Sequence, residues 1–280
     1  MVFPEETRIG GNAAPIPVQA AGGRPLVSII TGARNAEHTV KETIRSVINQ
    51  TYSEWEFIII DDCSTDHTYD VIKEFTDPRI RLYRNNTNAG IAACRNFGVS
   101  SARGEWIALI DADDIWESTK LEKQVTFNME MNADVSYTAS AFINQAGKRF
   151  GYVMRAVKEL NYRDLLRHNL MSCSSVMAKR ELLLRYPFCG LHNIHEDYAT
   201  WLKVVSSVGV AYGLDDPLLV YRMSKGSKSD SRVLSAKMTY NAYRYVGYGI
   251  ARSAWLTLKY ANYSIRKRMK LFAGQSPSAS

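Results

Sequence analysis

A regular alternation of apolar runs with helical segments between residues 25 and 115 constrains the fold of this chain more than any other feature. Short runs rich in Val and Ile recur there, and the stretches between them carry apolar residues at the spacing of an amphipathic helix. Strands are expected at 26–31, 57–60, 80–83 and 106–110, and helices at about 40–48, 68–75 and 91–101. Strands that are apolar throughout and separated by helices form a parallel sheet covered on both faces. The alternation therefore predicts a doubly wound α/β half over 25–115, with ligands bound beyond the carboxyl ends of its strands.

The segments on either side of this amino-terminal half are less regular. Residues 1–24 are rich in Gly, Ala and Pro without a sustained period, which predicts a flexible leader. Residues 116–230, the second half, are expected to be smaller and mixed, with strands at 135–143, 210–212 and 218–221 and helices near 163–168 and 197–206. A turn at Asp215-Asp216-Pro217 is expected to separate the last two strands, and Asn88 to be the N-cap of the helix at 91–101.

The net charge of +7 is concentrated in the tail, residues 231–280, which contains nine Lys or Arg and no Asp or Glu. Its apolar residues fall close to one helical face, made of Tyr248, Ala251, Trp255, Leu258, Ile265, Met269 and Phe272. Arg252, Lys259 and Arg266 recur along the flank of that face. This pattern is typical of a basic amphipathic helix in a membrane interface, so an anionic membrane surface is the expected partner. Packing on the body of the chain, or on a second copy in a homodimer, stays open, whereas nucleic acid is not expected as a partner.

The cysteines and the first residues indicate the cytoplasm. Cys63, Cys94, Cys173 and Cys189 form no C-x-x-C pair, and residues 1–6 lack the basic start and apolar core of a signal peptide. No window holds 18 uncharged apolar residues, so no transmembrane helix is predicted. We expect a cytoplasmic protein with free thiols, attached peripherally to the inner face of the cytoplasmic membrane.

Acidic clusters fall at the predicted strand ends and next to them, at Asp61-Asp62, Asp111-Ala112-Asp113-Asp114 and Glu196-Asp197. A single pair of this kind is often only a helix N-cap or a solvated turn. Three carboxylates within four residues, however, repel one another unless a cation lies among them, and their hard oxygens suit Mg²⁺ or Mn²⁺. The cluster at 111–114 therefore predicts a site for a divalent metal and a nucleotide.

Several motifs follow one another in a family-like order and spacing. They lie at 27–35, 46–52, 56–66, 88–96, 109–114, 195–198 and 221–222. Together they resemble family 2 glycosyltransferases over about residues 25–230. The resemblance implies a GT-A fold and inverting transfer of a sugar from a nucleoside diphosphate sugar, with UDP as the expected nucleotide. The implied acceptor is a saccharide or a polyprenyl-linked saccharide in the synthesis of bacterial capsule, exopolysaccharide or O-antigen.

The resemblance also implies how the two halves share the chemistry. Residues 25–115 would bind the nucleotide sugar, and residues 116–230 would bind the acceptor and supply the catalytic residue. Asp197 would be the general base, which the reaction needs because an acceptor hydroxyl has a pKa far above neutral. Asp113 would bind the divalent metal that bridges the diphosphate, and Asp111 would contact the ribose or hold the loop.

The remaining expected donor-binding residues are Asn35, Asp62, Arg95 and Arg222. By resemblance, Asp62 would bond the uracil ring and Arg95 would lie near the nucleotide. The chain departs from the family pattern at Arg34, where many members have a Tyr, although a guanidinium can also stack on a base or meet a phosphate.

A second departure is Ser224, which stands where many members have a His, so that Arg222, Lys225 or Lys228 would supply the positive charge. Two other functions stay open from the sequence. A nucleotidyltransferase acting on sugar phosphates would also place carboxylates and a metal at the end of an α/β sheet, but its glycine-rich basic loop is only poorly approximated at 31–35. An inactive sugar-nucleotide-binding subunit would have no reason to keep both Asp113 and Asp197.

Overall fold

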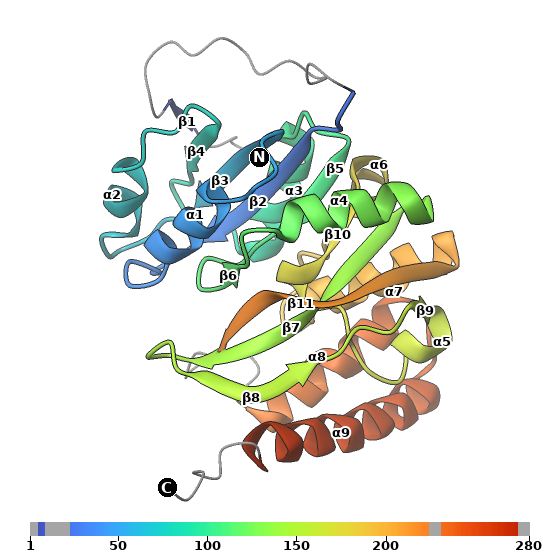
Figure 1. Cartoon of the computed structure of the whole chain (residues 1–280). Helices are drawn as coiled ribbons and strands as arrows, with labels where there is room; N and C mark the ends of the chain where they lie inside the picture. Colours follow the sequence, from blue (N-terminus) through green and yellow to red (C-terminus); the bar gives the residue numbers. More distant parts are fainter. Residues whose placement is uncertain (1–4, 9–22, 224–230, 274–280) are drawn as a thin grey trace, which may run out of the picture.

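The structure of the chain is a computed structural model that describes residues 5–8, 23–223 and 231–273 (Figure 1). Its strands are β1 (Glu5–Arg8), β2 (Val27–Ala33), β3 (Trp55–Asp61), β4 (Ile80–Arg84), β5 (Trp106–Leu109), β6 (Ile115–Trp116), β7 (Val135–Asn144), β8 (Arg149–Met154), β9 (Glu159–Asn161), β10 (Met177–Lys179) and β11 (Val210–Met223). Its helices are α1 (Val40–Ile48), α2 (Thr68–Lys73), α3 (Ile91–Ser101), α4 (Lys120–Met131), α5 (Tyr162–Leu165), α6 (Arg180–Arg185), α7 (Glu196–Val208), α8 (Arg232–Tyr245) and α9 (Ile250–Ala273), with a 3₁₀ turn at Cys173–Ser175.

The strands form one sheet in the order β1-β4-β3-β2-β5-β10-β7-β11-β6, with β8 paired to β7 and β9 to β11. The central strands β4, β3, β2 and β5 are parallel, as the alternation of strands and helices predicts. Strand β10 is inserted antiparallel between β5 and β7, and it joins the amino-terminal half to the second half. The expected fold, a doubly wound sheet with a smaller mixed half, is confirmed.

Two hydrophobic cores cover the two faces of the sheet. Neighbouring residues of one strand point to opposite cores, so Ile29 packs with the residues of α1, α2 and α4, whereas Ile30 packs with α3, α6 and α7. Helix α3 lies unusually close to β2, because a Cβ on Gly98 would come within 2.4 Å of the Ile30 side chain. The absent side chain at this position lets α3, which carries Arg95 and Asn96 one turn earlier, lie close against the sheet.

Two local predictions are wrong, each for a physical reason. Gly90, with φ 85°, is the N-cap of α3 in place of Asn88, because the Asp62 carboxylate accepts hydrogen bonds from the Ala89 and Gly90 amides. The expected turn at 215–217 lies inside the continuous strand β11, as a register shift between Leu214 and Leu219. A bulge of this kind tolerates a proline, which needs no ladder partner for its nitrogen. Within the expected leader, Glu5–Arg8 pair with β4 and cover its otherwise open edge.

The tail forms two helices instead of one, since the chain turns at Gly247, whose φ is 99°. Helix α8 packs on α7, and α9 lies against α8 at the end of the molecule far from β1 (Figure 1). Leu256 of α9 is buried, while Trp255 and Leu258 are 52% and 72% exposed. The tail thus packs on the body with one face and presents another to solvent, so the two alternatives drawn from the sequence are not exclusive. The side chains of Arg266, Met269 and Phe272 lie outside those that the structure describes.

Candidate active site

The acidic loop after β5 is held by contacts from four other segments. Asp111 receives a hydrogen bond at Oδ1 from the Arg95 guanidinium (2.7 Å), and its amide donates to the Ser174 hydroxyl (3.0 Å). The carbonyl oxygens of the loop accept from α1, since Thr39 donates to Ala112 (3.0 Å) and Thr43 to Asp114 (2.8 Å). The loop is therefore a rigid structure at the carboxyl edge of the parallel strands.

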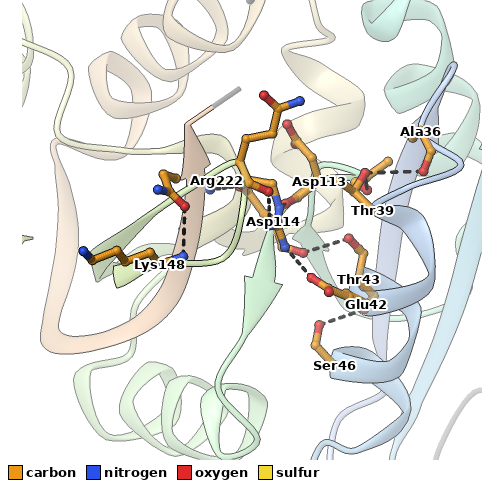
Figure 2. A network of polar contacts seen from close by, with 12 residues as sticks. Ala36, Thr39, Glu42, Thr43, Ser46, Asp113, Asp114, Lys148 and Arg222 are labelled. Atoms are coloured by element: carbon orange, nitrogen blue, oxygen red, sulfur yellow. Dashed lines mark hydrogen bonds and ion pairs between the residues drawn. The ribbon is translucent and has the colours of Figure 1, made fainter. Parts of the chain in front are cut away.

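Arg222 fastens the other side of this loop, as Figure 2 shows. Its amide donates to Asp114 Oδ1 (2.9 Å), and its Nε donates to the carbonyl of Asp113 (2.9 Å). The two terminal nitrogens reach the carbonyl of Gln145 and the carboxylate of Glu42 on α1. The Arg222 side chain is only 4% exposed. Arg222 therefore ties β11, the β7–β8 turn and α1 to the acidic loop.

Asp113 and Asp114 have different surroundings. Asp114 is fully buried, and its two oxygens accept from Arg222 and from the Ser174 hydroxyl (2.6 Å). Burial, and then the carboxylates of Asp113 and Asp111, raise the pKa of Asp114 well above its usual value, against the lowering effect of these two hydrogen bonds. Asp113 is half-buried. Asp114 is thus a structural member of the cluster, and Asp113 and Asp111 are the members that a ligand can reach.

The first turn of α7 faces this loop across Arg95. The Arg95 guanidinium contacts Glu196 Oε1 (3.2 Å) as well as Asp111, and its side chain is 6% exposed. Asp197 is half-buried, and its Oδ1 accepts from the Tyr198 amide (2.7 Å). Burial and the neighbouring Glu196 raise the pKa of Asp197, while His195 and Arg95 oppose the shift. The structure thus brings the predicted base and the acidic loop to one place, through a cation between them.

The predicted donor residues of β2 and β3 lie at the neighbouring strand ends. Asn35, with φ 49°, accepts from the Thr65 amide (2.9 Å) and so joins the loops after β2 and β3. Asp62 is 4% exposed and accepts from Asn85, Ala89 and Gly90, each at 2.8 Å. Arg34 is exposed beside Asn35. Ser224, Lys225 and Lys228 lie outside the described residues.

Sequence reasoning missed two residues of the site. Ser174 bridges Asp111 and Asp114 from the 3₁₀ turn, and no motif marks it. Tyr221 is half-buried beside the cluster, where burial and the charges of Asp114, Asp111 and Asp113 raise its pKa. Only its position next to Arg222 in the 221–222 motif hinted at a role for this tyrosine.

A divalent metal at this site would be held by the acidic residues of the loop 111–114. Over the part of the chain that the structure describes, no group of three or more His, Cys, Asp or Glu side chains could by itself enclose a metal ion. The accessible ligands are the carboxylate oxygens of Asp113 and Asp111, because Asp114 is fully buried and each of its oxygens already accepts a hydrogen bond. Mg²⁺-like ions are commonly held by one or two carboxylates together with substrate phosphates. The residues present therefore fit a metal that is bound jointly with a diphosphate.

Solved structures identify the fold class. The first 349 residues of S. aureus TarS in complex with UDP-GlcNAc superpose with a TM-score of 0.66 at 19% identity, over 90% of this chain and 76% of that one. The mannosyltransferase PcManGT from Pyrobaculum calidifontis, in complex with GDP-Man and Mn²⁺, gives 0.65 at 20% identity, over 92% and 76% of the two chains. The chain therefore has the GT-A fold of nucleotide-sugar-dependent glycosyltransferases.

Sequence comparisons then give the family. Residues 28–185 match the model of glycosyl transferase family 2. TuaG of Bacillus subtilis, named as a glycosyltransferase of teichuronic acid biosynthesis, is 34% identical over 88% of this chain and 98% of its own length. WfgD of Escherichia coli, named a UDP-Glc:α-D-GlcNAc-diphosphoundecaprenol β-1,3-glucosyltransferase, is 35% identical over 76% and 83%. The chain belongs to glycosyl transferase family 2 and is a glycosyltransferase, so the interpretation as a nucleotidyltransferase is set aside.

Proposed function

We propose that this enzyme is an inverting glycosyltransferase that moves a sugar from a UDP-sugar to a hydroxyl of a lipid-linked saccharide during surface polysaccharide synthesis. The observation that supports the proposal is the link that Arg95 makes between Asp111 of the acidic loop and Glu196, the residue next to Asp197. A single displacement with inversion requires a base on the side of the sugar away from the leaving diphosphate. Carboxylates of the acidic loop and of the first turn of α7, joined through Arg95, are consistent with that arrangement.

Asp197 is the proposed general base. Its raised pKa brings the carboxylate closer to the working pH, which makes it a better proton acceptor than an exposed aspartate. The Tyr198 amide holds Oδ1, and the acceptor hydroxyl gives its proton to the carboxylate as its oxygen attacks the anomeric carbon. The bond between that carbon and the diphosphate oxygen breaks in the same step.

Asp113 and Asp111 are the proposed ligands of a divalent metal. When bound, the metal neutralises the charge that develops on the leaving diphosphate. The chain's own contribution is to hold the two carboxylates fixed, through Ser174, Arg95 and Arg222. Because its guanidinium is fully engaged by the protein, we propose that Arg222 serves the donor by positioning this loop.

The proposed nucleotide pocket lies over the ends of β2 and β3. Asp62 fixes the loop before α3, and a direct bond to the uracil ring would use the remaining lone pair of its Oδ2. Asn35 shapes the adjacent loop, which leaves the exposed Arg34 to meet the base or a phosphate. The UDP named in WfgD and the UDP-GlcNAc in the TarS complex support this nucleotide.

The outer face of α9 is the proposed site of peripheral membrane attachment. Ile250, Trp255, Leu258 and Ile265 are between 48% and 72% exposed there, and Arg252 and Lys259 flank them. Lys259 Nζ lies 3.7 Å from the centroid of the Trp255 ring, which suits a basic and aromatic interface with anionic lipid headgroups. No helix in the described ranges is long and apolar enough to cross a bilayer. The diphosphoundecaprenol acceptor named for WfgD supports a lipid-linked substrate at such a surface.

The substitution Asp197→Asn tests the base. We expect transfer to fall by about 10³-fold or more, with UDP binding measured by calorimetry within about twofold of the wild type. Unchanged transfer by Asp197→Asn, or the loss of UDP binding together with transfer, would contradict the assignment. Inversion is tested separately. NMR gives the anomeric configuration of the product, which should be opposite to that of the donor.

The double substitution Trp255→Glu/Leu258→Glu tests the membrane face. We expect cosedimentation with vesicles containing phosphatidylglycerol to be lost, while Leu184→Glu, at a 47% exposed position on α6, leaves it unchanged. Transfer to a water-soluble acceptor analogue should be retained in both variants. A monomer–dimer shift in light scattering, with equal vesicle binding, would instead show that α9 contacts a second copy.

A further inference from the structure

Arg95 and Asn96, neighbours on α3, both bind the segment that leads into α7. Arg95 contacts Glu196 at 3.2 Å, one residue before Asp197. Asn96 makes a reciprocal pair with the backbone of Phe188, because its Nδ2 donates to the Phe188 carbonyl (2.9 Å) and its Oδ1 accepts from the Phe188 amide (2.8 Å). The two side chains thus hold both ends of the segment 188–196 on the same helix.

Helix α3 is a firm support for this segment. Its close approach to β2 depends on Gly98 and Gly32, where a Cβ would come within 2.4 and 2.7 Å of neighbouring side chains. The Asp62 carboxylate holds the amides at its amino end. The ring of Phe188 lies 5.4 Å from the Arg95 guanidinium, so the residue held by Asn96 also packs against Arg95.

We infer that Arg95, Asn96 and Glu196 are positioning residues that set the distance between the base and the donor site. The inference rests on the proposed role of Asp197 as the base. Arg95 links Asp111 of the donor loop to Glu196 beside that base, and Asn96 fixes the start of the same segment. None of the three needs to touch the substrate for this role.

The physical reason is geometric and electrostatic. A base displaced by about 1 Å from its attack geometry can lose about 10²-fold in rate. Without Glu196, the first turn of α7 loses its ion pair with a buried guanidinium, while Arg95 still holds Asp111. Removing Glu196 should therefore reduce catalysis and leave the donor site intact.

The experiment measures steady-state transfer at varied donor concentration for Glu196→Ala, Glu196→Gln and Asn96→Ala, with Glu130→Ala on the exposed surface of α4 as control. We expect Glu196→Ala to lower kcat about 10- to 100-fold with the donor KM within about twofold. Glu196→Gln should recover most of kcat, because its amide oxygen still accepts from Arg95. Asn96→Ala should lower kcat in the same way, and Glu130→Ala should match the wild type.

The outcomes separate this inference from the function on which it rests. If Asp197→Asn retains full transfer, the base assignment fails. If Asp197→Asn is inactive but Glu196→Ala and Asn96→Ala keep the wild-type kcat, the positioning role is overturned. A raised donor KM with unchanged kcat, or a Glu196→Gln variant as slow as Glu196→Ala, would also overturn it. Should Glu196→Ala fail to fold, the comparison of Asn96→Ala with the wild type decides in its place.

Discussion

The amino-terminal half and the second half reach the same sheet by different routes. In the first, β3 pairs with β2 and β4 with β3, each across one helical connection, and β5 returns to the free edge of β2, so that all four strands are parallel. In the second, β10 enters antiparallel between β5 and β7, and the long β11 pairs in parallel with β7. The difference teaches that the amino-terminal half supplies the acidic loop and part of its support, whereas Ser174 and Arg222 complete that support from distant segments of the second half.

The largest expected effect on stability comes from removing the Arg222 side chain, which joins β11 to the acidic loop and to α1. In Arg222→Met, the carbonyls of Asp113 and Gln145 lose their buried donor, and the Asp113 loop is released. We expect a loss of about 4 kcal/mol in the free energy of unfolding, measured in urea, since removing one partner of a buried charged network is costly. Metal-dependent UDP binding should weaken with it.

Arg149→Met is the matched control for this link. Its ion pair with Glu117 also joins segments that are distant in the chain, but both lie in the second half and the side chains are 63% and 40% exposed. A change below about 0.5 kcal/mol is expected there, because solvent screens such pairs. Equal losses of unfolding free energy in the two variants would show that the buried Arg222 network stabilises the fold no more than an exposed ion pair does.

The next effect compares the two faces of α9. Leu256→Ala removes a side chain that is 5% exposed and should cost about 3 kcal/mol, whereas Leu258→Ala, at 72% exposure, should change the unfolding free energy by less than about 0.5 kcal/mol. Thermal and urea unfolding of both variants measure the difference. Similar values would mean that the tail does not belong to the folded body, in conflict with the packing of α8 on α7.

These contrasts explain which parts of the site could be predicted from sequence. Asp62 and Asp111 each follow an apolar strand, and the apolar pattern is a local property of the sequence, so their placement at the carboxyl edge of one parallel sheet could be anticipated. The contacts of Ser174 with the acidic loop and the engagement of the Arg222 side chain by other protein groups could not be predicted. Both depend on β10 and β11 pairing with strands far away in the chain. For the same reason the sequence predicts a turn at Asp215, although Asp215 lies within β11 and its carboxylate accepts from the Ala156 amide, which follows β8.

A pH-dependent effect concerns Lys120, which is fully buried in the second half. Its ammonium contacts Gln124 Oε1 at 2.7 Å and lies 4.1 Å from the Trp116 ring centroid. Burial lowers the pKa of Lys120 to about 7. Between this value and its ordinary value of 10.5, the unfolded chain binds the additional proton, so stability rises with pH by up to about 1.4 kcal/mol per unit.

Lys120→Met removes that titration. The variant should be more stable than the wild type at pH 7, and the difference in unfolding free energy should shrink as the pH is raised to about 9.5. Urea unfolding of the two proteins across this range gives the difference directly, and subtracting one curve from the other cancels the groups that they share. A difference that does not vary with pH would contradict the burial of a titrating lysine.

The smallest expected effect lies in the amino-terminal half, at a backbone position with a positive φ. Cys63 follows Asp62 with φ 56°, a left-handed conformation that costs a residue with a Cβ about 1 kcal/mol or more. Cys63→Gly removes that cost but adds freedom to the unfolded chain, so a gain of less than about 1 kcal/mol is expected. Cys63→Ala keeps the strain and loses only the weak contact of Sγ with the Asn86 carbonyl, so it should bring no gain. If alanine stabilises as much as glycine in urea unfolding, the thiol and not the backbone is the source of the strain.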